Sequence, residues 1–149
     1  MKIAIGSDHG GYELKEVIKA LLSDEGIEYM DLGPENEESV DYPVYGQKVA
    51  EAVAGGQAER GIAICGTGVG ISIAVNKIPG IRGSLCTNEY MAEMTRRHND
   101  SNVLVLGGRV LGTELAKAIV KKWLYTEFEG GRHQRRLDEI TAIEEKYNQ

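Results

Sequence analysis

Short apolar segments alternate with segments of helical periodicity along nearly the whole chain, and this alternation restricts the possible folds more than any other feature. Strands are expected at residues 2–6, 27–32, 61–65, 81–86 and 103–106. Helices are expected at residues 12–23, 42–54, 69–76, 89–98, 112–127 and 133–147. Because a helix separates each strand from the next, the strands are expected to run parallel and to be joined by right-handed crossovers.

This order of elements predicts an α/β fold, a three-layer Rossmann-like sandwich with a five-stranded parallel sheet and an extra C-terminal helix. The 149 residues suit one domain, residues 1–149, and neither a linker nor an internal repeat divides them. The last helix is additional to the sandwich. It is expected either to cap the domain or to reach a second subunit.

Composition narrows the classes of partner. The net charge of −6 disfavours nucleic acid as a ligand, because proteins that bind it carry basic surfaces. The longest apolar runs are far shorter than the roughly 20 residues that span a bilayer, so a membrane role is also disfavoured. The two cysteines form neither a CxxC pair nor a disulfide framework, and no signal peptide is recognisable. A cytoplasmic location is therefore expected.

Cys65 ends the third expected strand and is followed by the glycine loop, residues 66–70, where a helix is expected to begin. A lone cysteine at a strand end is usually a small packing residue. Here, however, alternate glycines allow backbone N–H groups to turn towards a ligand and stabilise negative charge on oxygen. A thiolate beside such a loop is a competent general base. The loop matches neither the GxGxxG dinucleotide pattern nor a Walker A loop.

Two polar residues, Asp8 and His9, follow the first expected strand within a glycine-rich turn. Such a pair can simply form an Asx-type turn with an exposed imidazole. The carboxyl ends of parallel strands share one edge of the sheet, so these residues are expected on the same edge as Cys65. A sugar-binding role is favoured there.

His98 and Asn99 end the fourth expected helix, where both residue types are also favoured as C-terminal caps. They precede the fifth strand, so they are expected at the opposite edge from Cys65. A catalytic His98 would then act across a subunit interface.

Arginines supply the candidate phosphate ligands. Arg132 and Arg136 are four residues apart and share a face if the last helix starts early, whereas most arginines on a protein are simply solvated. Two guanidinium groups within one turn form a plausible phosphate clamp in an acidic protein. No metal site is expected, since the three histidines are dispersed and HxxH and HExxH patterns are absent.

Taken together, five motifs resemble the type B ribose-5-phosphate isomerases, which are grouped with the galactose-6-phosphate isomerase subunits. The resemblance covers essentially the whole chain. It rests on the motifs Gly6-Ser7-Asp8-His9-Gly10, Asp41-Tyr42-Pro43, Cys65-Gly66-Thr67-Gly68-Val69-Gly70-Ile71-Ser72, Arg97-His98-Asn99-Asp100 and Glu129-Gly130-Gly131-Arg132-His133-Gln134-Arg135-Arg136.

The resemblance implies an aldose–ketose isomerase without cofactor or metal that interconverts D-ribose 5-phosphate and D-ribulose 5-phosphate through a cis-enediolate. Cys65 would take the proton from C2, His98 would assist ring opening, and Thr67 and Asp8 are further catalytic candidates. The implied substrate-binding residues are Asp8, His9, Gly66, Thr67, Gly68, Val69, Gly70, Asn99, Arg109, Arg132 and Arg136. The partner implied besides the sugar phosphate is a second copy of the chain, in a homodimer or tetramer with shared sites.

Two alternatives remain open at this stage. A hexose-6-phosphate isomerase, acting on allose or galactose 6-phosphate, would use the same chemistry in a deeper pocket. A non-catalytic phosphate- or nucleotide-binding module would keep the glycine loop and the arginines but would not need Cys65 or His98.

Overall fold

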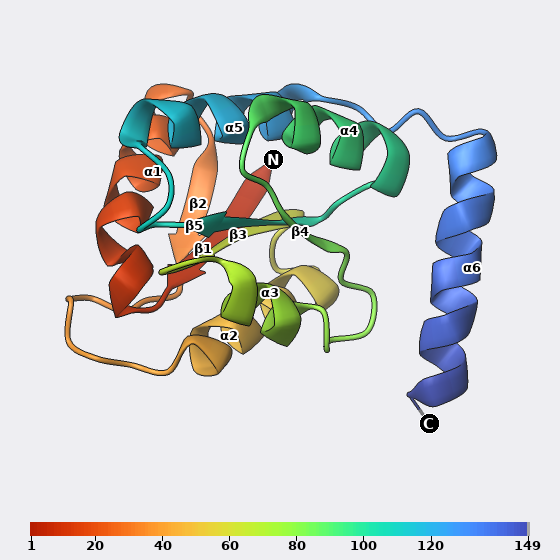
Figure 1. Ribbon diagram of the computed structural model, residues 1–149, viewed down its shortest axis with the longest axis horizontal. Coiled ribbons are helices and arrows are strands. Elements are labelled where there is room, and N and C mark those ends of the chain that lie inside the picture. The colour runs from red at the N-terminus through yellow and green to blue at the C-terminus, as the bar shows by residue number, and fades with distance from the viewer. Residues whose placement is uncertain (149) are drawn as a thin grey trace.

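A computed structural model describes residues 1–148 of the chain and contains one five-stranded parallel sheet (Figure 1). The strands lie side by side in the order β2-β1-β3-β5-β4. The chain therefore moves to one side of β1 to form β2 and then crosses to the other side for β3. This reversal opens a crevice beyond the carboxyl ends of β1 and β3, where ligands bind in sheets of this type. The strands are β1 (Lys2–Ser7), β2 (Glu28–Asp31), β3 (Arg60–Cys65), β4 (Gly83–Leu85) and β5 (Val103–Gly107).

Helices cover both faces of the sheet, which confirms the predicted three-layer sandwich (Figure 1). Successive side chains of a strand point to opposite faces. Ile3 and Ile5 accordingly pack among α1, α4 and α5, whereas Ala4 lies between them in sequence and packs among α2 and α3. The helices are α1 (Tyr12–Asp24), α2 (Tyr42–Ala54), α3 (Val69–Val75), α4 (Glu89–Asn99), α5 (Thr113–Tyr125) and α6 (Arg132–Tyr147), with a short 3-10 turn at His9–Gly11.

The expected boundaries hold to within about two residues, and the largest differences, at β4 and α5, have local causes. β4 is shorter than the predicted 81–86 because side chains bind the backbone at its start. Asn102 Oδ1 accepts the Arg82 N–H at 2.7 Å, and Asn76 Oδ1 accepts the Gly83 N–H at 2.8 Å. α5 ends at Tyr125 rather than at residue 127 because Thr126 has an extended backbone.

The C-terminal helix α6 stands beside the sandwich rather than in either helical layer (Figure 1). Only His133 and Leu137 of this helix are buried. Glu144 Oε1 accepts the Gly80 N–H at 2.8 Å and so ties the far end of α6 to the loop before β4. Ile140 and Ile143 remain 50% and 61% exposed. Within residues 1–148, no helix combines the length and the apolar character that crossing a membrane requires.

Candidate functional site

Cys65 lies at the carboxyl end of β3, level with Gly107 at the end of β5. Its side chain borders the core on the α2–α3 face and is 5% exposed. The N–H of Gly68 donates a hydrogen bond to the Cys65 sulfur at 3.2 Å. A donor directed at the sulfur stabilises negative charge there. The Gly68 amide is thus directed at the sulfur rather than at a substrate oxygen.

The glycine at position 68 is required by this geometry. Gly68 has a φ of +83°, and a β-carbon there would lie 2.5 Å from Leu85 Cδ1 and 3.1 Å from the carbonyl carbon of Leu106. The next amide, that of Val69, donates to Thr67 Oγ1 at 3.2 Å. The amides of residues 68 and 69 therefore both have partners within the chain, whereas the sequence analysis expects N–H groups of this loop to turn towards a ligand. An oxyanion site would use the other amides of the loop.

The turn after β1 lies against the glycine loop, as expected for carboxyl ends of neighbouring parallel strands. Asp8 is buried, and its Oδ1 accepts the Gly11 N–H at 3.0 Å, so it performs the turn-forming role considered from the sequence. His9 Nδ1 accepts the Val40 N–H at 3.2 Å. In a neutral imidazole the proton then resides on Nε2, which makes that nitrogen a hydrogen-bond donor.

Arg109 belongs to the same edge of the sheet. Its N–H donates to the Gly66 carbonyl oxygen at 2.9 Å, and its guanidinium group lies within 3.5 Å of the place a β-carbon of Gly66 would occupy. Arg109 and His9 line a cavity of about 190 Å³, together with Glu13. We call the residues gathered here, Asp8, His9, Cys65, residues 66–70 and Arg109, the thiol group of the site.

His98 and Asn99 lie at the opposite edge of the sheet. They end α4, and the chain enters β5 at Val103, whereas Cys65 is level with the last residue of β5. Four residues of strand correspond to about 13 Å. Arg132 begins α6 on the His98 side, one residue before a histidine that contacts His98. His98, Asn99, Arg132 and Arg136 thus belong to a second set, which we call the histidine group.

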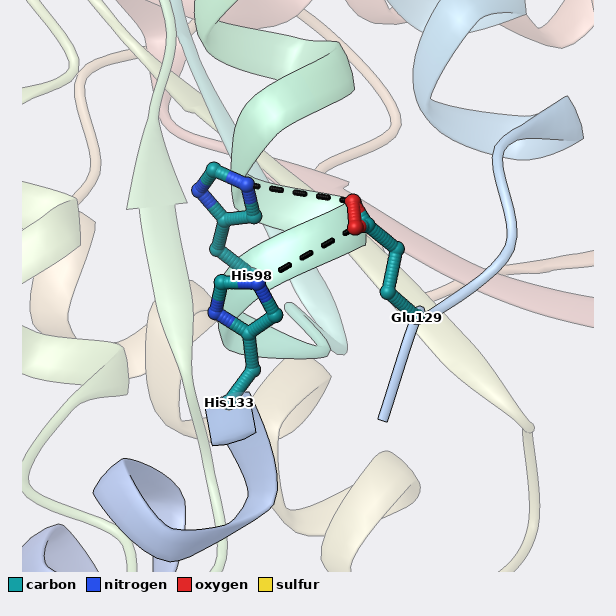
Figure 2. Close-up of side chains that lie close together, drawn as sticks. All are labelled: His98, Glu129 and His133. Atoms are coloured by element: carbon teal, nitrogen blue, oxygen red, sulfur yellow. Dashed lines mark ion pairs between the residues drawn. The ribbon is translucent and has the colours of Figure 1, made fainter. Parts of the chain in front are cut away.

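The histidine group contains two residues that the sequence analysis did not select, Glu129 and His133 (Figure 2). The rings of His98 and His133 stack with their centroids 4.2 Å apart and their planes 14° from parallel. Glu129 lies beside both rings, with one carboxylate oxygen 3.9 Å from His98 Nε2 and the other 3.9 Å from His133 Nε2. Burial, together with the neighbouring His98 and Arg132, lowers the pKa of His133. His133 is therefore neutral near pH 7.

Within residues 1–148, these three side chains bring histidine and carboxylate donor atoms within 4.8 Å of one another, the spacing at which a metal ion has to be considered. An imidazole nitrogen binds a metal along its lone pair, which lies in the plane of the ring. Two nearly parallel stacked rings hold their lone pairs in two separate, nearly parallel planes, so the lone pairs do not converge on one point. The arrangement fits two imidazoles sharing a carboxylate better than it fits a chelate.

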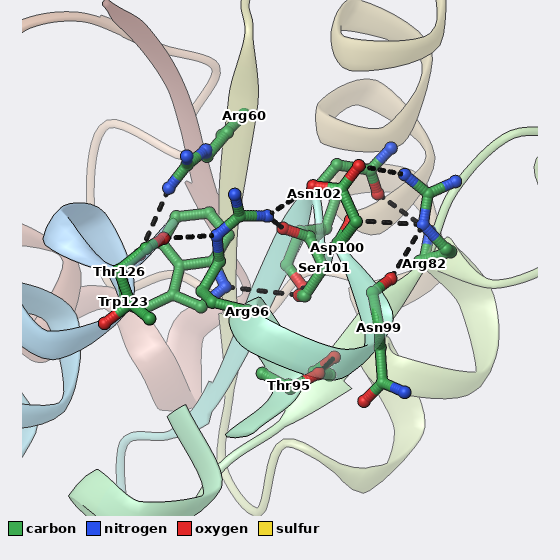
Figure 3. Close-up of polar contacts among 12 residues, drawn as sticks. Arg60, Arg82, Thr95, Arg96, Asn99, Asp100, Ser101, Asn102, Trp123 and Thr126 are labelled. Carbon is green, nitrogen blue, oxygen red and sulfur yellow. Dashed lines mark hydrogen bonds and ion pairs between the residues drawn. The ribbon is translucent and has the colours of Figure 1, made fainter. Parts of the chain in front are cut away.

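A buried polar network holds the last turn of α4, which carries His98 (Figure 3). The Arg96 Nη1 donates to Asp100 Oδ1 at 2.9 Å and to the Ser101 carbonyl oxygen at 2.7 Å, while its Nε donates to the Thr126 carbonyl oxygen at 3.1 Å. From the other side, Arg82 Nε donates to the Asn99 and Asp100 carbonyl oxygens at 3.0 and 3.1 Å. The carbonyl group of Asn99, the last residue of the helix, obtains a partner in this way.

Comparison with known proteins identifies the family. The model of the Ribose/Galactose Isomerase family matches residues 3–140. "Ribose-5-phosphate isomerase B" of Escherichia coli K12 is 55% identical over 147 residues, which is 99% of either chain. The solved Ribose-5-Phosphate Isomerase B of Clostridium thermocellum superposes with a TM-score of 0.98 at 60% identity and 99% coverage of both chains. The corresponding structure from Thermotoga maritima gives 0.93 at 51% identity, covering 95% of this chain and 97% of that one. This chain belongs to the ribose/galactose isomerase family.

Proposed function

We propose that this chain interconverts D-ribose 5-phosphate and D-ribulose 5-phosphate through a cis-enediolate, without a metal ion. The observation that carries the proposal is the Cys65 sulfur, which accepts an amide hydrogen bond at the carboxyl end of β3. A base held beside a glycine loop suits the removal of a proton next to a carbonyl group. The family, and the names of the relatives from E. coli and C. thermocellum, support the pentose phosphate as substrate.

The reaction begins with ring opening, because the aldose is mostly a closed furanose. His98 moves a proton between the anomeric hydroxyl and the ring oxygen, so that the C1–O4 bond breaks and the C1 aldehyde forms. The Cys65 thiolate then removes the C2 proton, and the released electrons form the C1–C2 double bond of the enediolate. The same proton is returned to C1 while a second proton passes from O2 to O1, which yields the ketose. Thr67 and Asp8 are the hydrogen-bonding partners of the two substrate oxygens, O1 and O2.

A complete site takes its two groups from different subunits. The thiol group and the histidine group lie at opposite edges of one sheet, about one strand length apart, which is too far for Cys65 and His98 to act on one pentose. In a homodimer, the histidine group of one protomer meets the thiol group of the other. The exposed apolar residues of α6 and of the α2–α3 face, Ile140, Ile143, Tyr42 and Ile73, supply surface for that contact. Pairing of dimers gives the tetramer.

Phosphate is bound by arginines of both groups. Arg109 and His9, whose Nε2 is a donor, bind the phosphate from the thiol group. Arg132 and Arg136 bind it from the histidine group. Gly66, Gly68, Val69, Gly70 and Asn99 line the sugar. The whole chain acts as one isomerase domain. Its two cysteines are free, which suits an enzyme of the reducing cytoplasm.

Replacement of each cysteine in turn tests the function. Cys65→Ala is expected to lower kcat for D-ribose 5-phosphate by about 10²- to 10⁴-fold, the usual contribution of a general base. Cys86→Ala is the matched control, since Cys86 is a buried core residue whose pKa is raised to about 12 by burial and which therefore stays an inert thiol. Turnover is measured by the appearance of the ketose, with circular dichroism confirming folding. Full activity of Cys65→Ala would exclude the thiol as the base.

The same assay separates the candidate substrates. We expect kcat/KM to be highest for D-ribose 5-phosphate when allose 6-phosphate and galactose 6-phosphate are measured beside it. Faster turnover of a hexose phosphate would reassign the substrate but leave the chemistry intact. Binding of all three without turnover would indicate a non-catalytic module.

A further inference from the structure

The ring of His98 is held from two directions by residues outside its own helix. His133 of α6 covers one face of the ring, with the centroids 4.2 Å apart, and Glu129 faces its edge at Nε2 (Figure 2). His133 is itself 5% exposed, so it forms a fixed platform rather than a mobile neighbour. His98 is about 40% exposed on its side chain, which leaves part of the ring open to a ligand.

The segment that carries Glu129 is attached to α4 next to His98. The Glu129 N–H donates to the carbonyl oxygen of Arg97, the residue before His98, at 3.1 Å. Three residues earlier in the segment, the Thr126 carbonyl oxygen accepts the hydrogen bond from Arg96. Two independent hydrogen bonds therefore fix the backbone of Glu129 relative to the last turn of α4. These contacts keep the backbone of Glu129 next to His98, within reach of the two rings for its carboxylate.

Glu129 presents one carboxylate to two imidazoles. The titratable and charged groups that face His133 are Glu129 and His98, together with Arg132 and Arg136 of its own helix. Burial and those arginines lower the pKa of His133, so His133 serves as a neutral stacking surface while the carboxylate faces the edge of the His98 ring. Ring opening needs a group that can both accept and donate a proton, and a histidine oriented by a carboxylate is suited to this exchange.

We propose that Glu129 and His133 are positioning residues that orient the His98 ring for opening of the sugar ring. The inference rests on the proposed function, since it assumes that His98 acts at the ring-opening step. His133 supplies the stacking surface and Glu129 supplies the charge. Neither residue touches the carbon atoms at which Cys65 acts.

The test compares two reactions of the same enzyme, of which only one needs ring opening. D-Ribose 5-phosphate must open before it isomerises. D-Ribulose 5-phosphate cannot form a furanose through its phosphorylated O5, so exchange of its C1 hydrogen with deuterium from D₂O reports enolisation alone. The variants are Glu129→Gln, His133→Ala and His133→Phe, the last of which keeps a flat buried ring. Arg135→Ala is the matched control on the exposed side of α6.

We expect Glu129→Gln and His133→Ala to lower kcat for D-ribose 5-phosphate about tenfold to a hundredfold, while deuterium exchange into D-ribulose 5-phosphate changes less than twofold. His133→Phe is expected to recover much of the loss, because the stack is restored. In Glu129→Gln, the pH profile of kcat/KM is expected to change, because a neutral amide replaces the carboxylate that faces both rings. Arg135→Ala behaves like the wild type in both reactions.

Two results would overturn the positioning role. One is wild-type isomerisation and an unchanged pH profile in both Glu129→Gln and His133→Ala. The other is an equal loss of isomerisation and exchange, which would indicate a general structural effect. Cys65→Ala distinguishes this failure from failure of the proposed function, because that function requires Cys65→Ala to lose both reactions. If His133→Ala does not fold, Glu129→Gln decides, since Glu129 is exposed and outside any helix.

Discussion

The two cysteines of this chain lie in different surroundings. Cys65 borders a loop whose Gly68 amide donates to its sulfur, whereas Cys86 is surrounded by core side chains. Burial alone raises the pKa of Cys86 to about 12, so it remains a thiol at neutral pH. Cys65 also borders the α2–α3 core, and the amide hydrogen bond to its sulfur is the contact that distinguishes it from Cys86.

Asp31 gives a pH-dependent prediction at the same scale. Burial raises its pKa, but hydrogen bonds from Lys15, Lys19 and the Gly33 N–H outweigh that effect, and the net pKa is lowered. The unfolded chain then binds more protons than the folded chain in acid, so this contribution to stability is present above about pH 4 and is lost as the pH falls through the folded pKa. We expect urea unfolding to give a free energy that falls with pH below 4 in the wild type and less steeply in Asp31→Asn.

At pH 7, Asp31→Asn is expected to be less stable than the wild type by about 2 kcal/mol, because the fully buried Lys15 loses its carboxylate partner. Glu28→Gln is the control, since the Lys2–Glu28 pair is exposed and such pairs contribute little. Equal pH dependence in the wild type and in Asp31→Asn would show that Asp31 titrates alike in the folded and unfolded states.

At the scale of elements, the end of α4 depends on long-range hydrogen bonds more than on its own sequence. Arg96 is 4% exposed and joins the helix end to the start of β5 and to the segment after α5. The glycine at position 68 has a comparable role in the loop after β3, where only a residue without a side chain fits. The end of α4 carries His98 and Asn99, and the loop that contains Gly68 follows Cys65. The packing of these two backbone segments therefore positions candidate site residues.

Arg96→Met is expected to destabilise the protein by about 3 kcal/mol, because the Ser101 and Thr126 carbonyl groups and the Asp100 carboxylate lose a buried donor. Arg97→Met, the neighbouring position, is expected to change stability by less than about 0.5 kcal/mol, since its side chain is exposed and pairs only with Glu93. Chemical denaturation of both variants makes the comparison. Equal stabilities of the two variants would contradict the importance of the buried network.

At the scale of the whole molecule, the parallel sheet separates the two groups of residues that the proposed reaction would need together. Every βα connection after β1 and β3 opens on the thiol side, and the helix that carries His98 ends on the other side. The proposed function therefore predicts that two chains associate to complete a site. A homodimer of two-fold symmetry would form two such sites at once.

Hybrid dimers test this arrangement directly. Cys65→Ala and His98→Asn chains are each expected to be nearly inactive, but an equal mixture that is unfolded and refolded together should recover about a quarter of the wild-type activity, because half of the dimers are hybrids and each hybrid has one intact site. Native mass spectrometry quantifies the hybrids. A mixture with the hybrids present and no recovered activity would point to a site built within one chain. Refolding each variant alone is the control.

The sequence by itself determined the architecture. The alternation of apolar and helical segments is a local property, because the spacing of apolar residues within a short segment indicates whether that segment forms a strand or a helix. It predicted five parallel strands, the bounds of α2 at 42–54, and the placement of Cys65 and Asp8 at one sheet edge and of His98 at the other. The roles of these residues remain predictions.

Tertiary structure alone decided the contacts across elements. The stack of His98 on His133 joins residues 35 positions apart, and the loop whose Gly68 amide donates to the Cys65 sulfur packs closely against Leu85 and Leu106. The four-residue spacing of Glu129 and His133 can be read from the sequence, but no local pattern places these two residues beside α4. Side-chain contacts of this kind depend on how remote elements pack together, and that packing is decided by the summed burial of the whole core rather than by any short segment.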